Sequence, residues 1–321
     1  MKYSTYLFIV VLFSILSCRK EEQPILRHPR GESSTSFTDL GTDYRYQAFF
    51  DLGTNSWQQK KLRTSWDLAF ESKSSGYHVL LNSSCLMAVW KVENIDFQNL
   101  IDTTGAVWSW DAASGNLDST AIGDWINSSA VYLVDCGMDY LGNHRGFKKI
   151  QLQEVTSNGY SFITANLDGT DYHQVNIEKD EVYNFQYFSF QNNSTELIAP
   201  PKDEWDLEFT TYTHYFEEEE MAYLVTGVLL NRSGVEVAEI TNIPFDDIEI
   251  DLLTNITFSN AVNTIGYNWK YYDFSSGIYV VNPSINYVIK TTEGKVFKLH
   301  FIDFYNDAGE KGTPKFEFKE L

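Results

Sequence analysis

The side chains in this sequence that could do chemistry are its carboxylates, tryptophans and histidines, and none of them falls into a catalytic spacing. The chain has no Gly-x-Ser-x-Gly turn, no His-Glu-x-x-His helix and no phosphate-binding glycine loop. Its many carboxylates show no spacing that would single out an acid/base pair for glycoside hydrolysis. The sequence therefore argues against an enzyme.

A tryptophan-rich stretch over residues 108–127 places Trp108, Trp110 and Trp125 near Asp111 and Asp118. Sugars stack on indole rings and hydrogen-bond to carboxylates, so this stretch is one candidate for glycan binding. Packing of the three rings beneath a long loop is the simpler interpretation. A calcium loop of the Asp-x-Asp-x-Asp-Gly type is absent, so these carboxylates do not predict a calcium site.

Three cysteines are present, and their spacing matches neither a zinc pattern nor the Cys-x-x-Cys-His signature of covalent haem attachment. If Cys18 is lipidated, Cys85 and Cys136 remain. In an oxidising compartment these two either form a disulfide or stay as two buried thiols on separate strands.

The amino terminus resembles a bacterial lipoprotein signal peptide. Lys2 is followed by the apolar run 7–16 and then by Ser17 and Cys18. The run is shorter than the roughly 20 residues that a membrane-spanning helix needs. We expect residues 1–17 to be removed, Cys18 to be acylated and to anchor the chain in a bacterial membrane, and residues 18–37 to form a flexible tether.

Composition limits the remaining possibilities. With 44 acidic and 24 basic residues the formal net charge is −20, so nucleic acid and anionic lipid surfaces are poor partners. Aromatic residues make up 16% of the chain, prolines number seven, and long helical periodicities are few. An all-β chain with a sizeable aromatic core is predicted.

The elements repeat along the chain. The stretch Trp205-Asp206-Leu207-Glu208-Phe209 echoes Trp66-Asp67-Leu68-Ala69-Phe70, and the aromatic run 183–190 lies the same 139 residues after the run 44–50. In both stretches apolar and polar residues alternate, as in a strand with one buried face. Two similar units are predicted, residues 38–170 and 171–321.

Two further pairs of similar segments are separated by a longer offset. The segment 228–233 repeats 79–84 after 149 residues, and 296–298 repeats 146–148 after 150 residues. The ten or so added residues predict a longer loop after the second tryptophan strand, and this loop would contain His214, Met221 and a solvated tip, Glu217–Glu220. A short helix capped by Asp118 or Ser119 is expected in the tryptophan-rich stretch, and a short helical connection is expected over residues 246–253.

At the two Trp-Asp-Leu-x-Phe strands and the hairpin of residues 287–301, the chain resembles the HmuY family of Bacteroidetes haem-binding lipoproteins. The resemblance is strongest over residues 181–321 and is also present over 37–170. It implies an all-β fold, here two tandem HmuY-like antiparallel β units with short helices in the connections. It also implies a lipid-anchored protein of the bacterial outer membrane that holds haem between loops through His or Met ligands.

The same resemblance implies where the ligand would bind. Haem-binding members can carry a His-Arg-Tyr run after the tryptophan strand, where this chain has Thr210, Thr211 and Tyr212. His214 and Met221 could ligate iron instead, since imidazole and thioether are both axial ligands of haem, and Tyr212 would line the pocket. The cofactor implied is non-covalent haem b, and the implied partner is a TonB-dependent outer-membrane transporter.

The five other histidines are expected to be hydrogen-bonded or solvated rather than ligands. They are His28, His78, His144, His173 and His300. Two alternatives to haem binding stay open: capture of another apolar or aromatic ligand such as a glycan, and a surface module that binds protein.

Overall fold

Alternation of apolar and polar residues places the chain in antiparallel strands, and the all-β prediction is confirmed in the computed structural model, which describes residues 31–321. Residues 32–321 form one compact unit. The predicted signal peptide, Cys18, His28 and the first part of the tether lie outside the described residues. Within residues 31–321 no helix has both the length and the apolar character needed to cross a membrane.

Within residues 31–321 every strand pair is antiparallel, and the strands form four larger sheets and a separate hairpin. The first sheet runs β1 (Ser34–Phe37), β20 (Lys311–Glu320), β19 (Val296–Tyr305), β18 (Ile285–Lys290) and β15 (Glu236–Thr241). The second runs β14 (Met221–Leu230), β13 (Leu207–Phe216), β2 (Tyr46–Asp51) and β3 (Ser56–Leu62). The third runs β12 (Ser194–Glu196), β11 (Phe185–Ser189), β4 (Leu68–Glu71) and β5 (Val79–Leu81).

The fourth sheet runs β10 (His173–Glu178), β9 (Gly159–Ala165), β8 (Phe147–Val155), β7 (Val131–Asp135) and β6 (Ala88–Val92). The hairpin is β16 (Lys270–Asp273) and β17 (Ile278–Val281). Five short 3₁₀ helices lie in the connections: η1 (Ser83–Cys85), η2 (Phe97–Asn99), η3 (Leu117–Ser119), η4 (Phe245–Asp247) and η5 (Ile250–Asn255). The cap of η3 is Asn116 and not Asp118 or Ser119, because the Asn116 side chain accepts the Asp118 N–H at 3.1 Å.

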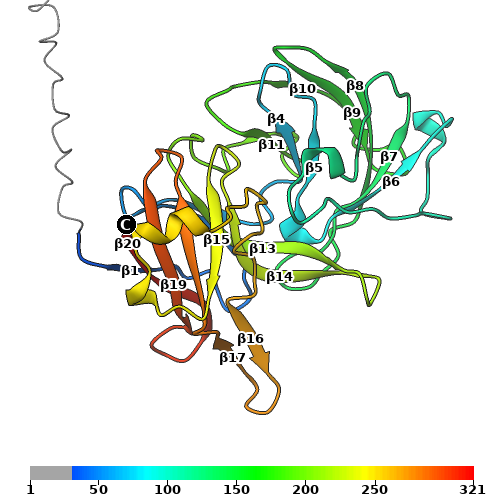
Figure 1. Ribbon diagram of the computed structural model, residues 1–321. Helices are drawn as coiled ribbons and strands as arrows, with labels where there is room; N and C mark the ends of the chain where they lie inside the picture. The colour runs from blue at the N-terminus through cyan, green and yellow to red at the C-terminus, as the bar shows by residue number, and fades with distance from the viewer. Residues whose placement is uncertain (1–30) are drawn as a thin grey trace, which may run out of the picture. The chain divides into compact units, whose positions relative to one another are not determined.

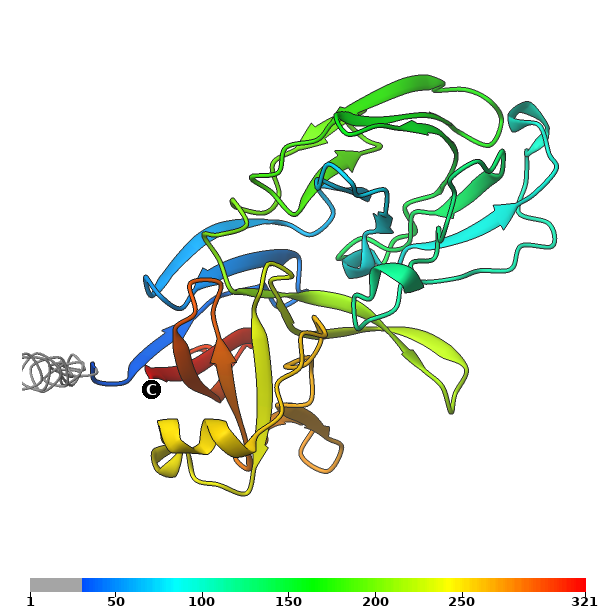
Figure 2. The ribbon, with the colours of Figure 1, turned by 45° about the horizontal axis from the view of Figure 1, so that its top comes forward.

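The four sheets pack in pairs around two hydrophobic cores (Figures 1 and 2). We call the third and fourth sheets the first lobe; their inward side chains, such as Phe70, Tyr132 and Phe162, share one core. The first and second sheets form the second lobe, whose core includes Phe209 and Phe316. Each lobe is thus a sandwich of two aromatic-rich sheets.

Each lobe contains strands from the other half of the chain: the second lobe includes β1, β2 and β3, and the first lobe includes β10, β11 and β12. β2, from the beginning of the chain, pairs with β13 of the second lobe, and β11 pairs with β4 of the first lobe. A third cluster, in which Phe49, Trp66, Phe185 and Trp205 meet, lies where the exchanged strands cross between the cores. The unit boundary near residue 170 remains a prediction, and both lobes contain strands from either side of it.

The two tryptophan strands begin with matching hydrogen bonds. The Asp67 carboxylate accepts the Phe190 N–H at 2.7 Å, and the Asp206 carboxylate accepts the Leu52 N–H at 3.0 Å. In both cases the carboxylate binds the backbone just after the exchanged aromatic strand. Backbone N–H groups that the sheet leaves free are satisfied in this way at both places.

The asparagines that follow also match. Asn82 donates its amide N–H to the Trp66 carbonyl at 2.7 Å, and Asn231 donates to the Trp205 carbonyl at the same distance. These equivalences support our proposal that the chain is a duplicated unit.

The end of the predicted tether is ordered. Ser34–Phe37 is strand β1, which pairs with Lys315–Phe318 of β20, so the expectation of a flexible segment is wrong for these four residues. The physical reason is that β20 would otherwise present an unpaired edge, and the short alternating segment covers it.

One further expectation needs correction. The predicted loop carrying His214 and Met221 is a hairpin of two ten-residue strands, and only Glu217–Glu220 form its turn. Of the two alternatives left open for Cys85 and Cys136, the structure has the two buried free thiols. The Cys85 sulfur is directed away to Arg63, donating to its carbonyl at 3.6 Å, and burial raises the pKa of both thiols.

Candidate functional site

The hairpin β13–β14 carries both residues proposed as iron ligands. His214 lies opposite Tyr223, and Phe216 lies opposite Met221. Directly opposed residues and alternate residues of a strand share one face, so all four side chains lie on the same face of the hairpin. His214 and Met221 are diagonal neighbours there, about 7–8 Å apart between Cβ atoms. Both side chains can reach a common ligand.

The imidazole of His214 is held between aromatic rings and has no hydrogen-bond partner. The Phe216 ring lies 4.7 Å and the Tyr267 ring 5.3 Å from it, both edge-on. Its Nδ1 is buried without a partner, and neither ring nitrogen is hydrogen-bonded within residues 31–321. A half-buried imidazole in this state retains a free lone pair that can coordinate a metal.

The remaining described histidines all contact a carboxylate, as the sequence predicted for structural histidines. The pairs are His78–Glu71 at 2.6 Å, His144–Asp135 at 2.8 Å, His173–Asp171 at 2.8 Å and His300–Glu317 at 3.0 Å. Among histidines 78 to 300, only His214 is therefore available as a ligand.

The far half of the hairpin is open to solvent and projects beyond the sheets in both ribbon views (Figures 1 and 2). Met221 is 48% exposed and Tyr223 is 55% exposed. The turn Glu217–Glu220 is fully exposed, as expected of a solvated tip. An apolar, aromatic surface next to a free imidazole is thus accessible to a large flat ligand.

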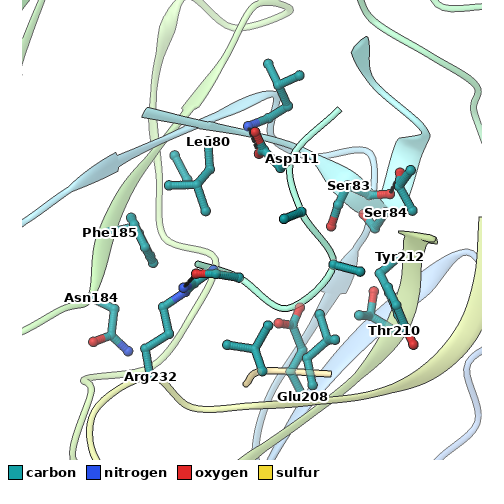
Figure 3. A pocket seen from close by; sticks show the side chains of 18 of the residues that line it. Leu80, Ser83, Ser84, Asp111, Asn184, Phe185, Glu208, Thr210, Tyr212 and Arg232 are labelled. Atoms are coloured by element: carbon teal, nitrogen blue, oxygen red, sulfur yellow. Dashed lines mark hydrogen bonds between the residues drawn. The ribbon is translucent and has the colours of Figure 1, made fainter. Parts of the chain in front are cut away.

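A separate cavity of about 110 Å³ lies between the lobes (Figure 3). The first lobe contributes Trp66 and Leu80, and the second contributes Trp205 and the part of β13 from Glu208 to Thr213. The loop of residues 111–116 lies across it. Tyr212, proposed to line the haem pocket, is buried and lines this cavity.

The loop over the cavity is held at both ends by hydrogen bonds. The two oxygens of Asp111 accept the N–H groups of Leu81 and Ala121, each at 2.7 Å. From the second lobe, the guanidinium of Arg232 donates to the Gly115 carbonyl. The carboxylate of Asp111 is thus structural and is not free for calcium.

Charged groups of the cavity have shifted pKa values. Burial raises the pKa of Glu208 to about 7, although nearby Arg232 acts to lower it, and burial raises the pKa of Asp111 to about 6. Burial lowers the pKa of Arg232. Among the described residues, Glu208 has no hydrogen bond and no ion pair, so its carboxyl group is free within the cavity.

The cavity contains no side chain that typically ligates haem iron axially through nitrogen or sulfur. Its lining has no histidine, methionine or cysteine. Thr210 and Thr211, which stand where haem-binding members of the resembled family can carry His and Arg, are among the lining residues. The structure therefore brings His214 and Met221 together toward the turn of the hairpin, whereas Tyr212, two residues before His214 on the same face of β13, lines the cavity.

The three tryptophans of residues 108–127 pack against protein groups. Trp108 stacks on Phe147 at 6.0 Å, Trp110 meets Tyr215 at 6.0 Å, and the Trp125 indole donates to the Tyr77 carbonyl at 2.8 Å. These contacts favour the packing interpretation.

Glu208 and Arg232 were not singled out from the sequence. A signal was present in the repeat, because the equivalent positions in the first copy are Ala69 and Ser83. Both of those residues line the same cavity. A comparison of the two copies for charge differences would have found the pair.

Sheet topology and site together define an all-β protein with two sandwich lobes, an aromatic hairpin that carries His214 and Met221, and a cavity between the lobes. The family model for HmuY protein matches residues 43–318. The chain belongs to the HmuY family, and the resemblance inferred from the tryptophan strands is confirmed.

Three solved structures are similar to the chain. Apo PinO from Porphyromonas gingivitis is 9% identical, with 91% of this chain and 98% of that chain covered and a TM-score of 0.31. The apo HmuY analogue of Tannerella forsythia is 12% identical, with 92% and 99% covered and a TM-score of 0.27. A Bacteroides vulgatus protein, proposed to be an HmuY-like haem binder, is 13% identical, with 90% and 94% covered and a TM-score of 0.24. No curated protein matches the chain.

Proposed function

We propose that this protein binds haem on the exposed face of the β13–β14 hairpin, with His214 and Met221 as iron ligands. The observation that carries the proposal is the state of His214, which has no hydrogen-bond partner among the described residues, in contrast to four histidines that contact carboxylates. Membership of the HmuY family, and the proposed haem binding of the Bacteroides vulgatus relative, support the same ligand class.

The surroundings of His214 suit a porphyrin. Phe216 and Tyr267 flank the imidazole, and Tyr223 and Met221 extend the apolar surface outward. A porphyrin is flat and largely apolar, so most of its binding energy comes from contact with such a surface. Iron would add one bond to the imidazole and one to the thioether.

The proposal includes the cellular context. Cys18, at the end of an apolar run, would carry acyl chains that anchor the protein to the outer membrane, and bound haem b would pass to a TonB-dependent transporter. Tyr212 would support the site from beneath, since it lies on the same face of β13 as His214.

Hemin titration of the full chain, followed by absorbance, tests the site. The wild type should show a shifted Soret band. His214→Ala should weaken hemin binding about tenfold or more, and Met221→Ala should change the spectrum to that of a different coordination state. His173→Ala, which removes a solvated histidine paired with Asp171, is the matched control and should behave as the wild type.

Two results would contradict the proposal. Absence of any Soret shift in the wild type would rule out haem as the ligand. Identical spectra and affinities for the wild type and both ligand variants would rule out this hairpin as the haem site. Anchoring is tested separately by membrane fractionation, in which Cys18→Ser should move the protein to the soluble fraction.

A further inference from the structure

We infer that the inter-lobe cavity is a second binding site, for a small monocarboxylic acid, with Arg232 and Glu208 as its polar anchors. The anchors lie at the end of the hairpin remote from its turn, and Glu208 is six residues before His214 on the same face of β13; the inference does not depend on haem binding. Apolar side chains, among them Leu80 and Phe185, form part of the cavity wall in Figure 3, and both anchors extend into the cavity.

The two anchors are charged groups that the protein leaves incompletely paired. Arg232 has five N–H donors, of which one meets the Gly115 carbonyl, and its guanidinium lies 5.5 Å from the centre of the Phe185 ring. Glu208 accepts no hydrogen bond from residues 31–321, and its carboxylate is not within ion-pair distance of Arg232. Both side chains are half-buried, so a ligand that enters the cavity would replace water at their unpaired polar atoms.

The sequence repeat argues against a purely structural role for Glu208 and Arg232 as an ion pair. The lobes are related by the repeat, and the first copy has Ala69 and Ser83 where the second has Glu208 and Arg232. All four positions line the cavity. The side of the cavity formed by the second copy is thus charged. On the side formed by the first copy, the small residues Ala69 and Ser83 leave room for a ligand.

The chemistry of the anchors selects the ligand. A guanidinium binds a carboxylate with parallel N–H donors. A protonated Glu208 would donate its O–H to the same carboxylate. Burial, which raises the pKa of Glu208 to about 7, allows this protonated form near neutral pH. The Thr210 hydroxyl, buried without a partner, lies on the same face of β13 as Glu208 and offers one further hydrogen bond.

The dimensions exclude a porphyrin and fit a short acid. About 110 Å³ corresponds to roughly four water molecules at their share of liquid volume. Propionate and benzoate are therefore suitable probes, because each combines one carboxylate with a small apolar body that the walls can cover.

The titratable and charged groups around Glu208 come from several elements. Arg232 follows β14, Tyr187 lies on β11, Asp111 lies on the loop above, and Glu71 at the end of β4 acts on Arg232. Asp111, whose pKa burial raises to about 6, is already bonded to two backbone N–H groups, so Glu208 is the carboxyl group that is free to bond a ligand and that titrates near pH 7. Ionisation of Glu208 would place a negative charge against the bound carboxylate.

Isothermal titration of the full chain with sodium propionate and sodium benzoate tests the inference, with sodium chloride at equal ionic strength as the reference. Wild-type affinity should fall about tenfold between pH 6 and pH 8, as the protonated fraction of Glu208 falls by that factor. Glu208→Gln cannot ionise and still donates, so its affinity should stay constant over this range. Arg232→Gln should abolish binding, and Arg232→Lys, which keeps the charge, should retain part of it.

Glu236→Gln, which neutralises an exposed carboxylate paired with Lys290, is the matched control and should follow the wild type. Thermal melting without probe shows whether each variant is folded. The inference fails if neither probe binds more tightly than chloride, if Glu208→Gln loses affinity with pH as the wild type does, or if folded Arg232→Gln binds equally well.

Discussion

Trp66 and Trp205 are the single residues on which the contact between the lobes most depends. Trp66 meets the Tyr187 ring and Trp205 meets the Phe49 ring, both at 4.9 Å between centroids and at 79°. In each case the partner ring lies on the strand exchanged from the other half of the chain. These two edge-on contacts fasten the exchanged strands to the lobes that receive them.

We expect Trp66→Ala and Trp205→Ala to lower the free energy of unfolding by similar amounts, about 3–5 kcal/mol each, because each empties a large aromatic position in a packed core. Urea unfolding of the two variants measures this. A loss below 1 kcal/mol in one variant and a large loss in the other would show that the two positions are not equivalent.

Buried carboxyl groups should make stability depend on pH. The pKa is raised to about 7 for Glu208 and to about 6 for Asp206, with burial as the main cause. Since both folded values exceed the ordinary ones, the folded chain retains protons that the unfolded chain has released. The contribution to stability is therefore full below about pH 4 and is lost as pH rises through 6 and 7.

We expect the melting temperature to fall between pH 5 and pH 8, and Glu208→Gln to remove the part of this fall above pH 6, a difference of a few degrees. Differential scanning calorimetry across this range checks the sign. A wild-type melting temperature that rises steadily toward pH 8 would contradict the assignment.

The sequence predicted the hydrogen-bonded or solvated state of most histidine side chains, but it gave no prediction of the cavity between the lobes. An unpaired His214 could be suspected because the other histidines lie in turns or polar strand positions that usually supply hydrogen bonds. Strand alternation alone did not mark Glu208 as a site residue, because a polar residue at an alternate position of a strand is ordinarily solvated. Only the crossing of the lobes makes that face an interior one.

Among the elements, the β13–β14 hairpin departs most from the sequence-based prediction. Alternation continues through Thr213, His214 and Tyr215, and it resumes from Met221, but the added length in the second copy was assigned to a loop. Cross-strand pairing extends over all ten residues of each strand. The strands persist because aromatic and β-branched residues pair across them, which a count of inserted residues does not reveal.

The acidic turn of this hairpin should oppose hemin. The propionates of haem are negative, and Glu217–Glu220 lie in the turn next to Met221. We expect replacement of all four glutamates by glutamine to tighten hemin binding several-fold at low salt and less at high salt, because screening weakens interactions between exposed charges. Hemin titration at two ionic strengths measures this effect.

Glu178→Gln, on the edge strand β10 of the first lobe, is the control and should leave hemin affinity unchanged. If the fourfold variant binds hemin as the wild type does at low salt, haem does not lie near this turn, and the hairpin site would have to be abandoned.

For the molecule as a whole, the repeat offset of 139 residues was visible in the sequence, but the strand exchange was not. Equal spacing of Trp66 and Trp205 is compatible with two separate units and with two crossed ones, because each tryptophan strand accepts either aromatic strand as a neighbour. The observed pairing is fixed by long-range contacts, such as the Asp206 carboxylate with the Leu52 N–H. Sequence periodicity does not report on such contacts.

A crossed arrangement predicts a single folding unit. We expect calorimetry of residues 32–321 to show one cooperative transition, and the separate fragments 32–170 and 171–321 to remain unfolded, since each lacks a central strand of its own sheet. Circular dichroism of the fragments, alone and mixed, tests this. A fragment that melts cooperatively by itself would establish two independent domains.

The strand exchange also delays folding during biosynthesis. The Leu52 N–H and its acceptor on Asp206 are 154 positions apart, and the Phe190 N–H and Asp67 are 123 apart. At roughly 5–20 residues per second, about 8–30 s pass before a ribosome that has made β2 delivers its partner β13. During that interval β2 has only its hairpin partner β3 beside it, so a nascent chain long enough to contain the whole first repeat still cannot adopt its final form.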